Sequence, residues 1–289
     1  QGARDEWPPC CGPGVPKPCM PARMFGCSRR TKTLGSMLQQ HQYFTGFVGK
    51  WHLSPPPGEL GQLIYGMRGK FPTMLTPETE AAAAALNAEW VAAREAHLAP
   101  KVRVTGFNYT GALSIGNVVD MGRLGLAVHN MDWEAQAGVD FIHEAHAHVE
   151  AGRARAYFLH LCTTLTHSPG PRQGICSDPR IAIGGLLPTA PNVLPSRDKL
   201  MALTGGQRCG WQEYDSAHTL WVDAAIGALI GTLRALGDEE NTLFIALADH
   251  QRVGKGTLYH GIRTPMVRAL VSLPLVSPLC LSLMSSTFR

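Results

Sequence analysis

Three stretches of the sequence share one pattern, in which an apolar run is followed at once by polar or charged residues. The first run, 43–48, is followed by Lys50 and His52. The second, 157–161, is followed by His167, and the third, 242–248, is followed by Asp249 and His250. Before the third run, apolar residues recur at helical spacing from Val222 to Leu233, and Gly237 stands where a helix would end. Alternating helices and short apolar strands predict an α/β fold, with a mostly parallel sheet sandwiched by helices.

The position of the polar residues predicts where the active site lies. In a parallel sheet, ligands bind beyond the carboxyl ends of the strands. Each of the three polar groups named above follows the end of an expected strand. We therefore expect these groups to gather at one edge of the sheet, whatever chemistry they carry.

Composition and charge fit a globular protein and exclude some classes of partner. The 289 residues are 45% hydrophobic and 17% charged, which suits one large domain or two small ones. The formal net charge of +4 is spread along the chain, so we expect no nucleic-acid binding. Residues 266–284 are largely apolar, but Arg268, Pro274 and Pro278 interrupt them, so no membrane span is expected. The eight cysteines are too scattered for a disulfide scaffold.

Two motifs give the predicted edge a specific chemistry. Residues 19–23 read Cys-Met-Pro-Ala-Arg, a C-x-P-x-R box, and residues 43–53 end in Gly-Lys-Trp-His-Leu after an aromatic and apolar run. Together they resemble the two signatures of the sulfatase family, which has an alkaline-phosphatase-like α/β fold. The resemblance implies that a formylglycine-generating enzyme oxidises Cys19 to formylglycine, the catalytic nucleophile. It also implies that Arg23 helps to hold this nucleophile.

Four further residues gain catalytic roles from the same resemblance. Lys50 would contact formylglycine and sulfate, and His52 would be the base that releases the sulfated intermediate. His167, which precedes Ser-Pro, would bind sulfate and protonate the leaving group. Residues 254–265 contain the family run K-G-x-x-x-x-G-x-R-x-P, so Lys255 would be a second lysine on the sulfate.

The resemblance also implies a bound metal ion. Asp249 and His250 would be ligands, together with the nucleophile at position Cys19. Carboxylate oxygen suits calcium, with magnesium as the alternative. Such a cation holds nucleophile and sulfate together and offsets developing charge. We therefore expect a calcium-dependent hydrolase that cleaves sulfate esters of a sugar or aryl alcohol, in a small molecule or a glycan.

One histidine-rich segment suggests a competing zinc site. Residues 143–148 read His-Glu-Ala-His-Ala-His, but an H-E-x-x-H zinc motif needs histidine at Ala147. On a helix His143 and His146 share a face, and solvated helix histidines are the simpler interpretation. His160 lies within an expected strand, and we expect it to be packed rather than catalytic.

The cellular location is inferred from the resemblance, which implies the secretory pathway and an extracellular or lysosomal site. Asn108-Tyr109-Thr110 is a glycosylation acceptor sequence and carries meaning only in a secreted protein. Residues 1–18 are rich in Pro, Gly and Cys and do not read as a signal peptide.

The resemblance covers residues 19–267 and departs from the family at both ends. Family members carry adjacent aspartates upstream of the nucleophile, and residues 1–18 contain no such pair. We therefore expect an irregular segment 1–18, an incomplete catalytic domain 19–267 and a divergent tail 268–289, with the fold truncated at both ends. Two alternatives stay open: a catalytically inactive or fragmentary relative, and a phosphonate or phosphodiester hydrolase of the same superfamily.

Overall fold

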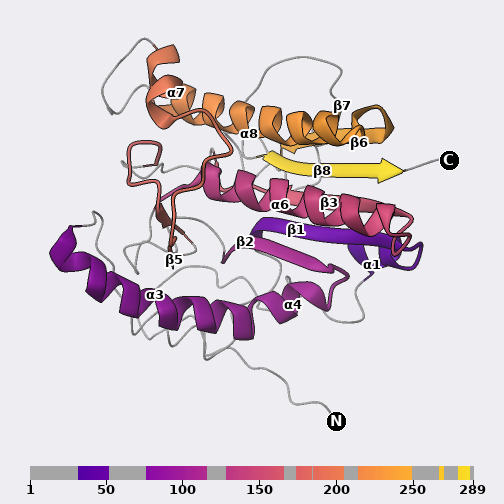
Figure 1. Cartoon of the computed structure of the whole chain (residues 1–289), viewed down its shortest axis with the longest axis horizontal. Helices are drawn as coiled ribbons and strands as arrows, with labels where there is room; N and C mark the ends of the chain where they lie inside the picture. Colours follow the sequence, from indigo (N-terminus) through magenta and orange to yellow (C-terminus); the bar gives the residue numbers. More distant parts are fainter. Residues whose placement is uncertain are drawn as a thin grey trace, which may run out of the picture.

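A mixed sheet forms the centre of the computed structural model. Its described residues are 32–51, 76–115, 128–165, 174–183, 185–204, 214–248, 267–269 and 279–286. Within them, six strands pair in the order β2-β1-β3-β8-β6-β7 (Figure 1). Their bounds are β1 Tyr43–Trp51, β2 Tyr109–Ile115, β3 Ala156–Cys162, β6 Thr242–Ala248, β7 Val267–Ala269 and β8 Leu279–Ser286. A separate two-stranded pair joins β4 (Ile181–Ala182) to β5 (Gly185–Leu186).

Strand direction divides the sheet into two parts. The neighbours β2, β1 and β3 are parallel to one another. In contrast, β8 pairs antiparallel with both β3 and β6, and β7 pairs antiparallel with β6. The α/β class is thus confirmed. The expectation of a mostly parallel sheet holds for β2, β1 and β3 only, because β8 is inserted between β3 and β6 in the opposite direction.

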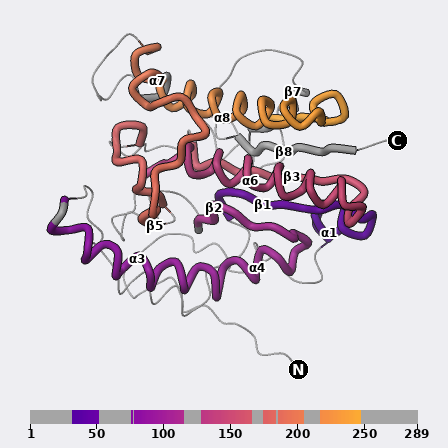
Figure 2. The backbone as a smooth tube through the Cα atoms, in the orientation of Figure 1, coloured from indigo at the N-terminus to yellow at the C-terminus, as the bar shows by residue number. Residues whose placement is uncertain are grey.

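Helices cover both faces of the parallel strands. These helices are α3 (Pro77–His97), α4 (Ala99–Arg103), α6 (Met131–Glu150) and α8 (Tyr214–Leu236). Successive side chains of a strand point to opposite faces, and β3 follows this rule. Tyr157 and Leu159 pack with α6 and α8, whereas Phe158 packs with α3 and α4. Figure 2 shows α6 and α8 running alongside each other.

Local sequence signals fix where several helices begin. Thr76 caps α3 through a reciprocal capping box with Thr79, and Pro77 occupies the first turn. Asn130 caps α6 by accepting a hydrogen bond from the Trp133 backbone. The shorter helices are α1 (Leu34–Gln39), α7 (Arg197–Leu203) and the 3-10 turn η2 (Glu239–Asn241).

Helix α8 is long and apolar enough, by length and composition alone, to cross a membrane. Its stretch Ala217–Leu236 has a mean hydropathy of 1.4. On this helix Trp221, Leu229 and Leu233 are buried in the core that α6 and the sheet share. Core helices have the same composition, so α8 gives no reason to propose a membrane span.

The segment expected as a divergent tail supplies an interior strand of the sheet. β8 pairs with β3 over Ala156–Cys162 and with β6 over Thr242–Ala248. The division of the chain at residues 18 and 267 stays a prediction. Pairing of β8 on both sides nevertheless means that part of segment 268–289 belongs to the same sheet as β1 and β3.

Candidate active site

Lys50 is the proposed catalytic residue that falls within the described part of the chain. The proposed residues that lie outside it are Cys19, Arg23, His52, His167, Asp249, His250 and Lys255. Their catalytic and metal-binding roles stay predictions. The site is therefore defined by Lys50 and by the side chains that surround it.

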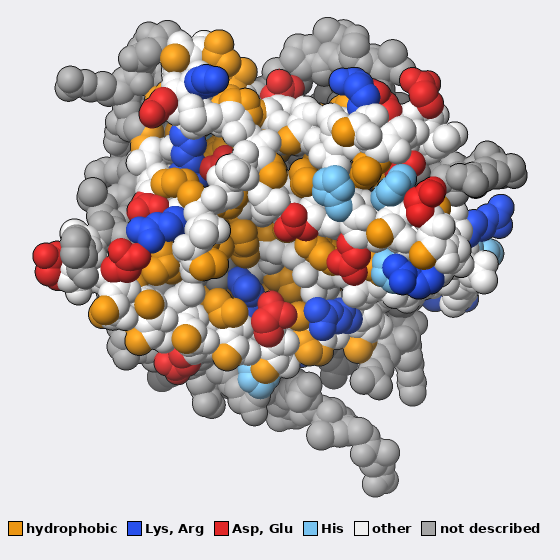
Figure 3. All heavy atoms as spheres, viewed as in Figure 1, with side chains coloured by type: hydrophobic (Ala, Val, Ile, Leu, Met, Phe, Trp, Pro, Cys, Tyr) orange, Lys and Arg blue, Asp and Glu red, His pale blue; other side chains and the backbone are white. Residues whose placement is uncertain are grey.

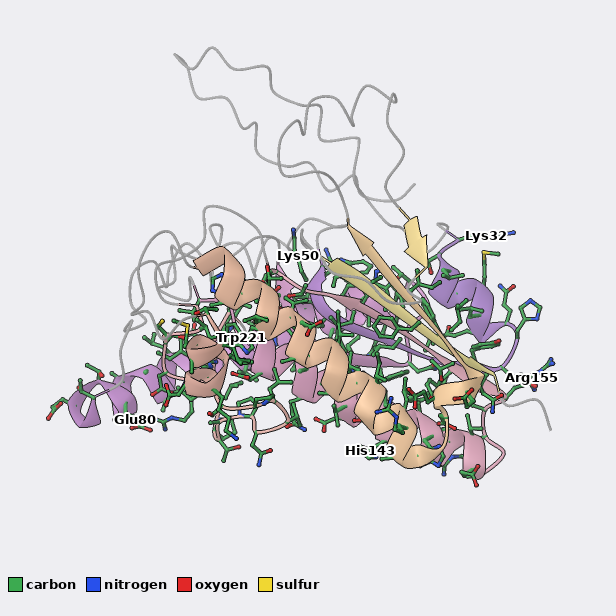
Figure 4. The ribbon with its side chains drawn as sticks, turned by 90° about the horizontal axis from the view of Figure 1, so that it is seen from above. Lys32, Lys50, Glu80, His143, Arg155 and Trp221 are labelled. Carbon is green, nitrogen blue, oxygen red and sulfur yellow. The ribbon has the colours of Figure 1, made fainter. Side chains whose placement is uncertain are left out.

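Lys50 lies half-buried near the carboxyl end of β1. It pairs with Ser114 of β2, after an irregularity in register between Val48 and Lys50. Ser114 is fully buried, and its hydroxyl has no hydrogen-bond partner among the residues described. Figure 4 shows the Lys50 side chain extending beyond the ribbon at the end of the strand. Lys50 therefore lies at the edge of the sheet where the sequence predicts the active site.

Gly49 allows β1 to approach β3 closely just before Lys50. Its φ of 95° lies in the left-handed region that favours glycine. It stands opposite Cys162 in the parallel register, and a Cβ at this position would collide with the Cys162 carbonyl oxygen. The glycine of the Gly-Lys-Trp-His motif is thus required by the backbone that presents Lys50.

The residues that follow β3 lie at the same edge as Lys50. Thr163, Thr164 and Leu165 are all buried. The Thr163 hydroxyl accepts a hydrogen bond of 3.0 Å from the Leu165 backbone. Because β1 and β3 are parallel and in register, their carboxyl ends lie at the same edge of the sheet. The two threonines therefore follow β3 at the edge where Lys50 lies near the end of β1.

Glu134 in the first turn of α6 brings a carboxyl group to this edge. Its side chain is almost fully buried, with only 1% of the residue exposed. Burial raises the pKa of Glu134 to about 7, while hydrogen bonds from Thr163 and Thr164 and the charge of Lys50 lower it. One carboxyl oxygen, Oε2, has no hydrogen-bond partner among the described residues. Glu134 therefore exchanges its proton near neutral pH.

Sequence reasoning missed Glu134, although a signal for it exists. Helical spacing puts Glu134 on the same face of α6 as Gly138, Phe141 and Ala145, and the structure buries all four. An acidic residue on the apolar face of a helix is rare unless it is paired. The periodicity of α6 could thus have identified Glu134 as a buried acid.

Two buried histidines continue the polar cluster away from Lys50. His129 Nδ1 lies 2.8 Å from the Thr164 hydroxyl oxygen. The rings of His129 and His218 meet edge to face, with their centroids 5.7 Å apart. His218 in turn stacks on Trp221 of α8. No sequence motif had singled out either histidine as functional.

Asp132 fixes the start of α6 to its neighbours. Its carboxylate accepts a hydrogen bond of 2.7 Å from Arg197 Nε and one of 3.0 Å from Trp221 Nε1. The Arg197 guanidinium also lies over the Trp221 ring, 4.6 Å from its centroid. This arrangement joins α6, α7 and α8 and holds Glu134 on a rigid first turn.

The histidines of α6 do not converge on one point. His146 Nδ1 lies 2.8 Å from Asp238 Oδ2, to which the Tyr157 hydroxyl also donates. His148 stacks on the ring of Phe44. The expectation that these histidines are simply solvated is wrong for His146, because Asp238 binds it. Figure 3 shows histidine side chains on the surface over the C-terminal half of α6.

His160 is packed, as its position within a strand predicts. Its ring stacks on Phe47 at a centroid distance of 5.5 Å and meets Phe158 edge to face. Burial lowers the pKa of His160 to about 4, so the imidazole is neutral at physiological pH.

The described residues bear on three further kinds of chemistry, namely metal binding, glycosylation and disulfide bonding. These residues contain no group of three His, Cys, Asp or Glu side chains that could hold a metal ion. Asn108 is exposed at the start of β2, and its side-chain oxygen accepts a hydrogen bond from the Thr45 backbone. Its glycosylation stays a prediction. Cys162 and Cys176 are both disulfide-bonded.

Comparison with known proteins adds no family assignment. No protein-family model matches the sequence, and no curated protein is significantly similar to it. The sulfatase resemblance therefore rests on the sequence motifs alone.

Proposed function

We propose that this protein is a sulfuric ester hydrolase of alkaline-phosphatase-like fold, with a formylglycine derived from Cys19 as its nucleophile. The observation that carries the proposal is the position of Lys50 at the carboxyl edge of three parallel strands. This edge is where α/β sheets bind ligands. The motif that contains Lys50 and the general rule for parallel sheets therefore point to the same place.

Lys50 would supply a positive charge for the sulfate group. A sulfate ester is an anion, and negative charge on its oxygens resists the approach of a nucleophile. A half-buried ammonium group stabilises such charge better than a solvated one, because water screens it less.

The remaining groups are proposed from the motifs. Calcium, held by Asp249, His250 and the nucleophile at Cys19, would offset charge and orient the sulfate. Arg23, His52, His167 and Lys255 keep the roles that the resemblance implies. A secretory location also belongs to the proposal, and the disulfide-bonded Cys162 and Cys176 support it, because disulfides persist in oxidising compartments.

The test is hydrolysis of an aryl sulfate by the full chain, produced with a formylglycine-generating enzyme and assayed in calcium buffer. Lys50→Met should lower kcat/KM by about a hundredfold or more, the usual loss for one charge-stabilising donor. Lys199→Met is the matched control, because Lys199 is exposed on α7 and only its backbone bonds Ser196. Equal turnover by the two variants would show that Lys50 does not belong to the active site. A bis-aryl phosphate diester and an aryl phosphonate monoester, assayed in parallel, test the phosphodiester and phosphonate alternatives.

A further inference from the structure

A pocket of about 400 Å³ lies between α6 and the segment that follows β5. From α6, the side chains of Trp133, Gln136 and Asp140 line it, and residues 187–192 form the opposite wall. Figure 1 shows this segment beside the N-terminal half of α6. Pockets that hold small ligands have volumes of this order. Lys50 is not among the described residues that line the pocket.

The α6 wall combines an aromatic ring with two polar side chains. Trp133, Gln136 and Asp140 are three and four positions apart, so they share one face of the helix. The Trp133 ring is half-buried, and the Arg94 guanidinium lies over it, 5.6 Å from the ring centroid. Gln136 Nε2 donates a hydrogen bond of 2.8 Å to Asp140 Oδ1. The wall thus presents a held aromatic ring beside a paired amide and carboxylate.

The opposite wall is fixed at both of its ends. Leu187 donates a backbone hydrogen bond of 2.8 Å to the Arg180 carbonyl oxygen, and Leu194, just beyond the pocket, packs on the core. Between these anchors, Pro188 and Pro191 each lock the backbone angle φ. A wall restrained in this way loses little conformational entropy when a ligand binds, so the pocket is preorganised.

The polar groups of the pocket suit hydroxyl groups better than an anion. Asp140 is the titratable residue of the described lining, and its carboxylate repels sulfate and phosphate. Thr189 and Asn192 are exposed in the opposite wall, and each can both donate and accept a hydrogen bond. Neighbouring hydroxyls of a pyranose ring match such carboxylate and amide groups. The C–H face of the same ring packs on an aromatic side chain.

We propose that this pocket binds a neutral saccharide, with a pyranose ring against Trp133 and its hydroxyls on Asp140 and Gln136. The inference is independent of the proposed hydrolysis, because Lys50 lies outside the described lining of the pocket. The pocket would hold the protein on an uncharged glycan through contacts that involve no sulfate group.

The experiment is an NMR titration of the full chain with the methyl glycosides of glucose, galactose, mannose and N-acetylglucosamine. At least one should bind with a Kd of about 1 mM or below, the affinity expected for a ligand of this size. Trp133→Ala and Asp140→Ala should each weaken this affinity about tenfold. Asp223→Ala is the matched control for Asp140→Ala, because Asp223 is exposed on α8. It should bind as the wild type does.

Each result either supports or overturns the inference. A folded wild type that binds none of the glycosides overturns it. An affinity that is unchanged in Asp140→Ala, or that falls equally in Asp223→Ala, shows that the sugar binds elsewhere and also overturns it. Lys50→Met should leave the sugar affinity unchanged, and so should an excess of inorganic sulfate at constant ionic strength. Loss of affinity in either case would assign the sugar to the proposed active site instead.

A second variant covers the case in which Trp133→Ala fails to fold, since Trp133 also packs on the core. Gln136→Ala removes an amide from the helix surface and should weaken the affinity about fivefold. Wild-type affinity in a folded Gln136→Ala protein contradicts the inference. Aryl sulfate turnover on the same preparations separates the two proposals. A protein that binds the glycoside but lacks turnover refutes the proposed function alone.

Discussion

Gly49 of β1 lies against the carbonyl oxygen of Cys162 in β3, with no room between them for a side chain. The two residues are partners in the parallel register, and the φ of Gly49 is 95°. Lys50 follows immediately, so the close approach of the two backbones determines where its side chain begins. A motif glycine thus has a purely geometric role in presenting a motif lysine.

Gly49→Ala should destabilise the protein. The substitution places a Cβ against the Cys162 carbonyl and forces alanine into the left-handed region, so we expect a loss of at least about 2 kcal/mol in the free energy of unfolding. Urea denaturation followed by circular dichroism measures it. Gly227→Ala on α8 is the control, because nothing lies within 4 Å of its added Cβ. It should stabilise the protein by up to about 1 kcal/mol. Equal stability of the two variants would contradict the packing described.

Glu134→Gln should change the pH dependence of stability. The pKa of Glu134 is raised from 4.5 to about 7 on folding, so the folded state binds its proton more tightly than the unfolded state. The stabilisation is complete below pH 4.5 and is lost as the pH rises through 7, a total of about 3 kcal/mol. Glutamine has no such titration. The variant should therefore gain stability relative to wild type between pH 4.5 and 7, measured by urea unfolding at several pH values.

The control for this prediction is Glu144→Gln, on the exposed side of α6. Its unfolding free energy should run parallel to that of the wild type over the same pH range. If Glu134→Gln also ran parallel, Glu134 would be solvated and the burial of its carboxyl would be refuted.

Arg197→Met should destabilise the protein strongly, because it leaves the Asp132 carboxylate buried without its cation. The side chains of Arg197 and Asp132 are 12% and 7% exposed, and loss of one partner of such a pair costs about 3–5 kcal/mol. Arg234→Met is the matched control, since Arg234 forms an exposed pair with Glu239. The chemical denaturation midpoint should fall for the first variant and stay unchanged for the second. A similar midpoint for both would mean that Asp132 is hydrated.

Cys19 should carry formylglycine when the chain is produced with a formylglycine-generating enzyme. Trypsin releases residues 5–23 as one peptide, because Pro18 blocks cleavage after Lys17. This peptide also contains Cys10 and Cys11, so fragmentation spectra must localise the change. We expect an aldehyde at position 19 and intact thiol masses at the other two cysteines. Unmodified Cys19 in active protein would exclude the proposed nucleophile.

The apolar runs predicted the strands well because each run is short, rich in β-branched or aromatic residues and bounded by turn residues. The runs 43–48, 157–161 and 242–248 correspond to β1, β3 and β6. The segments that form β2 and β7 were not predicted as strands, and neither was the segment that forms β8. Pro274 and Pro278 precede it, and its pairing partners β3 and β6 are distant in sequence. Strand pairing between segments so far apart in the sequence leaves no pattern in the local sequence that would predict it.

The sequence by itself determined the α/β class, the main strands and the location of Lys50 after an apolar run. Periodicity and turn residues are local properties, and they act before any tertiary contact forms. Only the tertiary structure decided that β8 divides the sheet and that the carboxyl group of Glu134 is buried. The periodicity of α6 places Glu134 on its apolar face, but no local pattern shows which other residues meet that face. The burial of Glu134 and its raised pKa arise when α6 packs on β1 and β3, because that contact removes water from the carboxyl group.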